Sequence, residues 1–300
     1  MKTSHLIILA HFIASLLATS CSSGQATAPG TAATVTLPAN QPILVKPTKV
    51  KPNLPSVTTP QLTAKRAVVL DAITGRILYQ KNARTPCAVA STQKLLTALC
   101  VARAGSLEDP VTVIEADTNV VPSKLYIRAG EQYTRRQLVK GLLVKSGNDL
   151  AKALARDVSG SEAAFVALMN RTAANIGMTQ SHFKNPHGLT EEGQQSTALD
   201  IAILAREVNK IPFYRECMQT KEYLFQYPGD RGTKTLYNTN KVLSKLPYCT
   251  GMKTGTTRAS GRCLVSSGTL NGKSVIAVAL GSTGEEIWND SEKLLKWALE

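Results

Sequence analysis

The sequence has few of the side chains that bind transition metals. Apart from two histidines near its N-terminus, the chain of 300 residues contains only His182 and His187. So few histidines, with so little carboxylate near them, argue against a zinc hydrolase. The cysteines show no spacing typical of zinc sites, and they are Cys21, Cys87, Cys100, Cys217, Cys249 and Cys263. In an exported protein a disulfide is permitted, and Cys217–Cys249 is one pairing that the sequence allows but does not assign.

The sequence also lacks any block of like charge and any internal repeat. It is basic overall, with 35 Lys and Arg against 21 Asp and Glu and a formal net charge of +14. Strong basicity can indicate a nucleic-acid partner, but the charges are spread along the chain and an export signal at the N-terminus argues against one. An anionic wall polymer or a membrane surface is a better match, and most of the charges are typical of a solvated surface.

The N-terminal segment, residues 1–21, has the order of regions found in a secretory signal peptide. Lys2 precedes an apolar run over residues 6–17, which is shorter than the roughly 20 residues of a spanning helix. Small residues then lead directly to Cys21, which resembles the bacterial lipoprotein signal, although Ala18 stands where that signal more often has leucine. The resemblance implies that Cys21 carries a lipid and anchors an exported protein to a membrane. Ordinary cleavage near Cys21 is the alternative.

Residues 22–61 differ in composition from the remainder of the chain. They are rich in Ala, Thr, Pro and Ser, carry only lysine as a charged residue and show no apolar period. We interpret them as a disordered tether, which as a flexible coil has an r.m.s. reach of roughly 35 Å. Such a spacer suits a catalytic domain that works at some distance from its anchor.

The predicted catalytic domain covers residues 62–300. Strand patterns over residues 67–70 and 76–79 form a hairpin, and another strand over 274–280 comes after an Asn271-Gly272 turn. Helical patterns lie between these ends, over residues 135–145, 149–158, 161–176 and 197–208, and a last helix covers 291–299. The domain should therefore be α+β, with one antiparallel sheet built from both ends of the chain and a helical lobe inserted between them. Because the sequence ends after this helix, we expect no C-terminal β-domain.

The segment most informative about function begins at Ala90, where a helix is predicted to start. Ser91 and Lys94 lie three residues apart and so share one helical face. A serine needs a base to become a nucleophile, and a lysine that stays neutral can be that base. Taken alone, however, the pair is better explained by a capping serine and a solvated lysine.

Three further segments change this interpretation when they are taken together. Ser146 and Asn148 come after the helix over 135–145, and Lys253-Thr254-Gly255 enters a strand-like run, where Gly255 would let a substrate backbone lie close to an edge strand. The Asn185–Leu189 loop has ordinary turn chemistry, and we favour a structural role for it. In their order and spacing, Ser-x-x-Lys, Ser-x-Asn and Lys-Thr-Gly form the set found in penicillin-interacting serine enzymes.

On these motifs the sequence resembles the low-molecular-weight penicillin-binding proteins of the D-alanyl-D-alanine carboxypeptidase family, the S11 serine peptidases. The resemblance runs from about Ala67 to the final helix. It implies the transpeptidase fold shared with serine β-lactamases, an α/β/α sandwich. The segments that carry it are Leu70-Asp71-Ala72-x-x-Gly75, Ala90-Ser91-x-x-Lys94, Ser146-Gly147-Asn148-Asp149, Asn185-Pro186-His187-Gly188-Leu189, Gly251-x-Lys253-Thr254-Gly255 and Ser291-Glu292-Lys293-Leu294-Leu295.

The resemblance implies a catalytic role for three residues. Ser91 would attack the carbonyl between the two terminal D-alanines of a peptidoglycan stem peptide and form an acyl-enzyme. Lys94 would take its proton, and Ser146 would bridge Lys94 and Lys253 and pass a proton to the leaving amine. β-Lactams would be covalent inhibitors, and neither a metal nor another cofactor would be needed.

The resemblance also implies how the substrate is bound. Asn148 would hydrogen-bond the substrate amide and orient Lys94. Lys253 and Thr254 would bind the terminal carboxylate, and the backbone N–H of Ser91 and of Thr256 would form the oxyanion hole. The residue at position 256 is often bulkier in the family. With Thr256 at this position, the family resemblance does not determine the shape of the substrate groove.

Three alternatives to a carboxypeptidase remain. A D,D-endopeptidase that cuts cross-links would use the same residues, and some single-domain relatives do this. A class A β-lactamase would need a Glu-x-x-Leu-Asn segment, which this sequence does not contain; Glu191-Glu192 lie in a different setting. A non-catalytic wall-binding lipoprotein would be expected to have a damaged motif, and all three motifs are intact.

Overall fold

The computed structural model of the protein describes residues 59–300. The predicted signal peptide, the lipidation candidate Cys21 and nearly all of the predicted tether lie outside the described residues, so these remain predictions.

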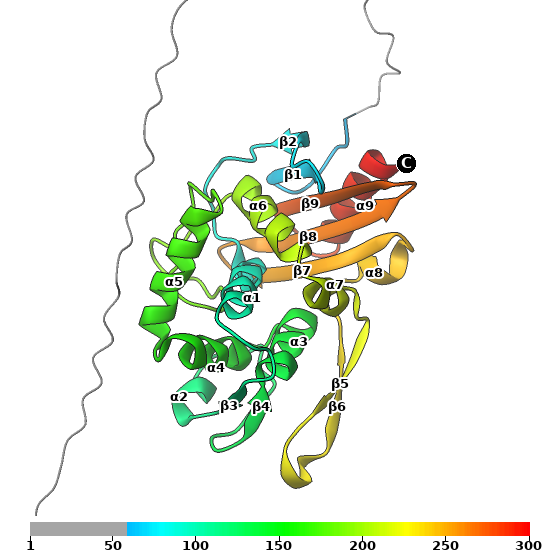
Figure 1. Cartoon of the computed structure of the whole chain (residues 1–300). Helices are drawn as coiled ribbons and strands as arrows, with labels where there is room; N and C mark the ends of the chain where they lie inside the picture. Colours follow the sequence, from blue (N-terminus) through cyan, green and yellow to red (C-terminus); the bar gives the residue numbers. More distant parts are fainter. Residues whose placement is uncertain (1–58) are drawn as a thin grey trace, which may run out of the picture. The chain divides into compact units, whose positions relative to one another are not determined.

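The framework of the domain is a five-stranded antiparallel sheet with the strand order β2-β1-β9-β8-β7 (Figure 1). The N-terminal hairpin of β1 (Arg66–Asp71) and β2 (Ile77–Lys81) pairs with β9 (Lys273–Ser282) near the other end of the chain. Next come β8 (Gly261–Leu270) and the edge strand β7 (Cys249–Thr257). The turn between β8 and β9 places Asn271 and Gly272 at φ +48° and +77°, as a type I′ hairpin requires. The predicted sheet built from both ends is confirmed.

Both faces of the sheet are covered, which explains why its central strands are apolar throughout. Along β1, Ala67 and Val69 join a core beneath α9 (Glu286–Leu299), while Val68 and Leu70 join a larger core on the opposite face. That opposite face is covered by α6 (Ala198–Asn209), which contacts β1 and β9. Helix α9 begins five residues before the predicted 291, and its buried Asp290 accepts backbone N–H bonds from Thr63 and Ala64, both at 2.8 Å.

In the sequence, the predicted helical lobe is inserted between the N-terminal hairpin and the C-terminal strands of the sheet; in space it lies to one side of the sheet, below β7 in Figure 1. At its centre α1 (Lys94–Arg103) is buried over most of its length and contacts four other helices. Helix α3 (Arg135–Lys145) begins in a capping box, in which Thr134 and Gln137 satisfy each other's backbone N–H groups. The other members of the lobe are α3 (Arg135–Lys145), α4 (Asn148–Ser159), α5 (Glu162–Asn175), α2 (Glu115–Thr118), β3 (Pro110–Thr112) and β4 (Gln132–Thr134).

The segment between α6 and β7 contains elements that the sequence patterns did not reveal. Helix α7 (Pro212–Gln219) is followed by a hairpin of β5 (Glu222–Gln226) and β6 (Thr233–Tyr237), which projects away from the main sheet (Figure 1), and by the short α8 (Val242–Lys245). Cys217 in α7 and Cys249 in β7 are both free thiols, so the conceivable disulfide is not formed. Within residues 59–300 no helix has the length and apolar character needed to cross a bilayer.

Candidate active site

Ser91 lies in a tight 3₁₀ turn, η1 (Ala90–Gln93), directly before α1 rather than inside its first α-helical turn. Two glycines allow neighbouring chain segments to pack against this turn. A Cβ atom at Gly255 would lie 2.8 Å from the Ser91 backbone nitrogen, and one at Gly188 would lie 2.2 Å from the Ala90 carbonyl oxygen. Gly255 is therefore required by the contact between β7 and the Ser91 turn. The predicted approach of a substrate backbone at Gly255 stays a prediction.

Lys94 is the first residue of α1, and its side chain is fully buried. Its Nζ atom lies 2.8 Å from Ser91 Oγ, 2.7 Å from Asn148 Oδ1 and 2.6 Å from the carbonyl oxygen of His187. The Asn148 amide is oriented by its own Nδ2, which donates to the Val121 carbonyl at 2.9 Å. Two of the three neighbours of Nζ are thus oxygens that can only accept hydrogen bonds. A neutral amine has two N–H groups for them, which leaves its lone pair for the Ser91 hydroxyl.

The surroundings of Lys94 favour this neutral form. Burial, and secondarily the charge of Lys253, hold the pKa of Lys94 well below its usual range, while Asp149 opposes the shift. Burial also lowers the pKa of Lys253 to about 7. The Asp149 carboxylate is itself occupied by backbone N–H groups, including those of Leu125 at 2.9 Å and Tyr126 at 2.7 Å. The pair of buried lysines therefore satisfies the electrostatic condition for a lysine base.

The Asn185–Leu189 loop supplies one of the three contacts of Lys94, which our structural interpretation of this loop missed. Asn185 Oδ1 accepts the Gly188 N–H at 2.8 Å, and the Asn185 carbonyl accepts Gln93 Nε2 at 2.6 Å. These bonds fix the loop so that the His187 carbonyl faces Lys94. The contribution comes from the backbone, so residue chemistry alone gave no signal; the position of the loop among the family motifs was the available clue. Burial, helped by the charges of Lys94 and Lys152, lowers the pKa of the His187 imidazole to about 3.

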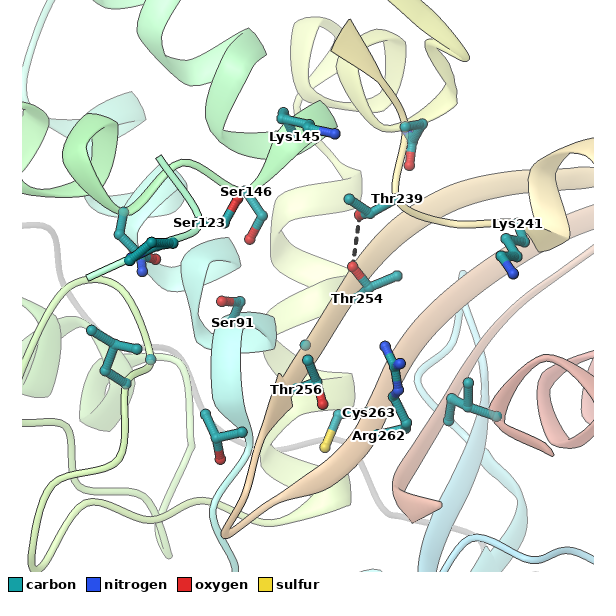
Figure 2. Close-up of a pocket in the computed structure, with 18 of the residues that line it drawn as sticks. Ser91, Ser123, Lys145, Ser146, Thr239, Lys241, Thr254, Thr256, Arg262 and Cys263 are labelled. Atoms are coloured by element: carbon teal, nitrogen blue, oxygen red, sulfur yellow. Dashed lines mark hydrogen bonds between the residues drawn. The ribbon is translucent and has the colours of Figure 1, made fainter. Parts of the chain in front are cut away.

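The predicted site residues meet at one pocket, to which all three motifs contribute (Figure 2). Lys94 and Lys253 lie behind its wall and are 0% and 1% exposed, and Lys253 Nζ donates to the Thr254 carbonyl at 3.0 Å. Thr254 Oγ1 shares a hydrogen bond of 2.6 Å with Thr239 Oγ1, drawn as a dashed line in Figure 2. Six of the eight predicted catalytic and binding residues line the pocket, namely Ser91, Ser146, Asn148, Thr254, Gly255 and Thr256.

Ser146 ends α3 in the left-handed conformation, with φ +72°, and its side chain lies on the same pocket as Ser91 (Figure 2). Among the hydrogen bonds of residues 59–300, none joins the Ser146 hydroxyl to Lys94 or to Lys253. The predicted bridge between the two amines therefore stays a prediction.

A hydroxyl paired with a buried lysine amine, whose surroundings favour the neutral form, is on this α+β fold the arrangement expected of a serine acyl-transfer site. The family comparison agrees with this class. Residues 53–284 match the family model described as Peptidase S11, D-alanyl-D-alanine carboxypeptidase. The chain belongs to this family, and the predicted penicillin-binding protein fold is confirmed.

Individual relatives show how far the similarity extends. D-alanyl-D-alanine carboxypeptidase DacF of Bacillus subtilis is 36% identical over 241 residues, which cover 78% of this chain and 62% of the relative. DacB2 of Mycobacterium tuberculosis is 32% identical, over 81% of this chain and 84% of the relative. The crystal structure of the Streptomyces K15 DD-transpeptidase superposes with a TM-score of 0.77 at 31% identity, over 80% of this chain and 98% of that one. The chain thus spans less than two thirds of the length of some relatives, DacF among them.

Proposed function

We propose that the protein is a serine-type D-Ala-D-Ala carboxypeptidase that removes the terminal D-alanine from peptidoglycan stem peptides. Membership of the family supports the substrate class. The observation that supports the chemistry is the contact of 2.8 Å between Ser91 Oγ and Lys94 Nζ. The other two atoms that contact this amine are carbonyl oxygens. This arrangement supports proton transfer from the hydroxyl to the amine.

In the proposed reaction, Ser91 Oγ forms a bond to the carbonyl carbon between the two D-alanines while its proton passes to Lys94. The negative charge on the carbonyl oxygen is stabilised by the backbone N–H groups of Ser91 and Thr256. The C–N bond then breaks, and the proton reaches the leaving amine through Ser146. Water hydrolyses the acyl-enzyme and releases the shortened peptide.

Substrate binding in this proposal uses the wall of the pocket. Asn148 is held between Lys94 and the Val121 carbonyl, so it serves chiefly to orient the base and presents its remaining hydrogen-bonding capacity to the substrate amide. Thr254 presents a hydroxyl for the terminal carboxylate. Lys253 adds the second buried amine that lowers the pKa of Lys94.

The test is covalent labelling combined with release of D-alanine. The wild-type protein should release D-alanine from a diacyl-L-Lys-D-Ala-D-Ala peptide and form a stable adduct with fluorescent penicillin, and peptide mapping should place the adduct on Ser91. Ser91→Ala should lose both activities by roughly three orders of magnitude or more, because within residues 59–300 no other nucleophile is hydrogen-bonded to Lys94. Ser123→Ala, which alters another serine of the pocket wall, is the matched control. Labelling of Ser91→Ala at the wild-type rate would reject the assignment.

The same experiment separates the carboxypeptidase from a D,D-endopeptidase, which would use identical residues. Wild-type protein is incubated with cross-linked and with uncross-linked muropeptides, and the products are resolved by mass. Loss of one alanine from uncross-linked stems supports the proposal. Products that arise only by opening of cross-links would favour the endopeptidase instead.

We further propose that the protein is exported and held at a membrane by a lipid on Cys21, with residues 22–61 as the spacer between anchor and domain. The support is the leader sequence, in which small residues directly precede a cysteine. Cys21→Ala should move the protein from the membrane fraction to the soluble exported fraction without changing penicillin labelling. A variant that stays in the membrane fraction would show that the lipid is not the anchor.

A further inference from the structure

The pocket wall carries an unbalanced charge. Among residues 59–300, the charged side chains that line it are Lys145, Lys241 and Arg262, with no Asp or Glu. A surface with cations alone attracts an anionic ligand and repels none of its negative groups. The question is which cation contacts the terminal carboxylate of a bound peptide.

Lys253, for which this role was predicted, is poorly placed for direct contact. Its side chain is 1% exposed, it is not part of the pocket wall, and its amine donates to the carbonyl of Thr254. A buried amine with a pKa of about 7 is also only partly charged at neutral pH. A cation in the wall itself is better placed to meet the carboxylate.

Of the three wall cations, Lys241 is already paired. Its Nζ lies 3.1 Å from Glu285 Oε1 and over the ring of Trp288. Lys145 lies on the α3 side of the pocket, beyond Ser146 (Figure 2). Arg262 has no ion pair and no side-chain hydrogen bond to any residue within 59–300. Arg262 is thus an exposed guanidinium without a partner in the part of the chain that the structure describes.

The sheet register places Arg262 beside the threonines of the Lys-Thr-Gly strand. Arg262 in β8 is directly opposite Thr256 in β7, so their side chains lie on the same face of the sheet, and Thr254 lies on that face as well because side chains alternate along a strand. Figure 2 shows the guanidinium extending from beside Thr256 toward Thr254. A carboxylate at this point would meet two N–H groups in the planar geometry that binds it bidentately, together with a threonine hydroxyl.

We infer that Arg262 binds the terminal carboxylate of the substrate and makes this enzyme selective for peptides with a free, charged C-terminus. The inference rests on the proposed function, since it assigns a specificity residue to that site. Arg262 is not required for formation of the acyl-enzyme as such: its contribution depends on the negative charge of the leaving group, and it should disappear when that charge is removed.

The test compares two substrates that differ only in this charge, an acyl peptide ending in D-Ala-D-Ala and its C-terminal amide. Wild-type protein should prefer the acid in kcat/KM, and Arg262→Gln should reduce this preference by roughly 10- to 100-fold, as expected for loss of a charge-assisted pair. The rate on the amide should change little, which also shows that the variant is folded. Arg262→Lys should retain part of the preference, and Lys145→Gln, which removes the other unpaired wall cation, should retain it fully.

Acylation by benzylpenicillin and by its methyl ester provides a second readout that does not depend on peptide hydrolysis. Arg262→Gln should slow acylation by the acid relative to the ester, whereas Lys145→Gln should not. If wild-type protein is acylated but cleaves neither peptide, the proposed function fails and the penicillin comparison still decides the role of Arg262. Unchanged acid preference in Arg262→Gln, or its transfer to Lys145→Gln, would overturn the inference.

Discussion

Basic residues lie both behind the pocket wall and on its surface, and their environments differ. Behind the wall, Lys94 and Lys253 are excluded from water and their pKa values are lowered, in the case of Lys253 to about 7. On the wall, Arg262 is exposed to solvent. Lys253 and Arg262 lie on the neighbouring strands β7 and β8, and Lys94 is the first residue of α1.

The difference shows that burial determines whether a basic side chain can accept a proton or stays charged. Desolvation penalises the charged form of an amine, so a lysine behind the wall can accept a proton. A guanidinium in the wall stays charged and can hold an anion, because it does not lose its proton under ordinary conditions. In our proposals, proton transfer and recognition of an anion are thus assigned to two basic residues in different environments. A charge that favours the protonated form of Lys94 should therefore remove its ability to accept a proton.

The largest effect is expected when Lys94 is made to behave like an exposed cation. Asn148→Asp places a carboxylate where Oδ1 now lies, 2.7 Å from Nζ. An opposite charge at this distance favours the protonated amine, so acylation by penicillin at pH 7 should fall by roughly 10- to 100-fold. The pH at which half of the maximal acylation rate is reached should rise by roughly one to three pH units. Stopped-flow or gel-based labelling across pH 6–10 measures both.

Two controls separate the charge effect from damage to the fold. Lys94→Arg is the limiting case, a permanent cation, and should stay inactive at every pH in this range. Asn148→Asp, in contrast, should recover as the pH rises, because the amine can still lose its proton. A constant deficit across the pH range would mean that the loss comes from the broken contact with Val121 and not from the charge of Lys94.

The sequence-based expectations succeeded where a local pattern determines the structure. The terminal strands and the helices over 135–145 and 197–208 are predicted by hydrophobic period and capping, and the structure has them within one or two residues. Three short motifs made it possible to predict the catalytic and binding residues, and six of these eight residues line one pocket. The hairpin of β5 and β6 escaped prediction because each strand is only five residues long and has a single buried residue, Phe225 in β5 and Leu236 in β6, so the apolar pattern is too short to indicate a strand.

Contacts made by backbone atoms, or by residues outside the motifs, could not be predicted from the sequence. The His187 carbonyl carries no side-chain signal, and the role of Gly255 depends on how closely β7 approaches the Ser91 turn. Arg262 is an ordinary arginine in the sequence. Its position beside Thr256 is set only by the register between β7 and β8, and that register is a property of the folded sheet.

The smallest expected effect is on the free energy of unfolding. It compares a buried lysine, Lys253, with a lysine that reaches solvent, Lys145. Because the pKa of Lys253 is about 7 in the folded protein and near 10.4 when unfolded, only the unfolded chain is protonated between these values. Stability from this residue is therefore fully present above the unfolded pKa and is lost as the pH falls toward 7. Relative to Lys253→Met, the free energy of unfolding of the wild type should rise by about 1 kcal/mol from pH 7.5 to 8.5. Urea unfolding at these pH values measures the difference, and Lys145→Met, which removes a lysine that reaches solvent, should keep the wild-type pH dependence. Parallel curves for wild type and Lys253→Met would show that Lys253 is not held uncharged behind the wall.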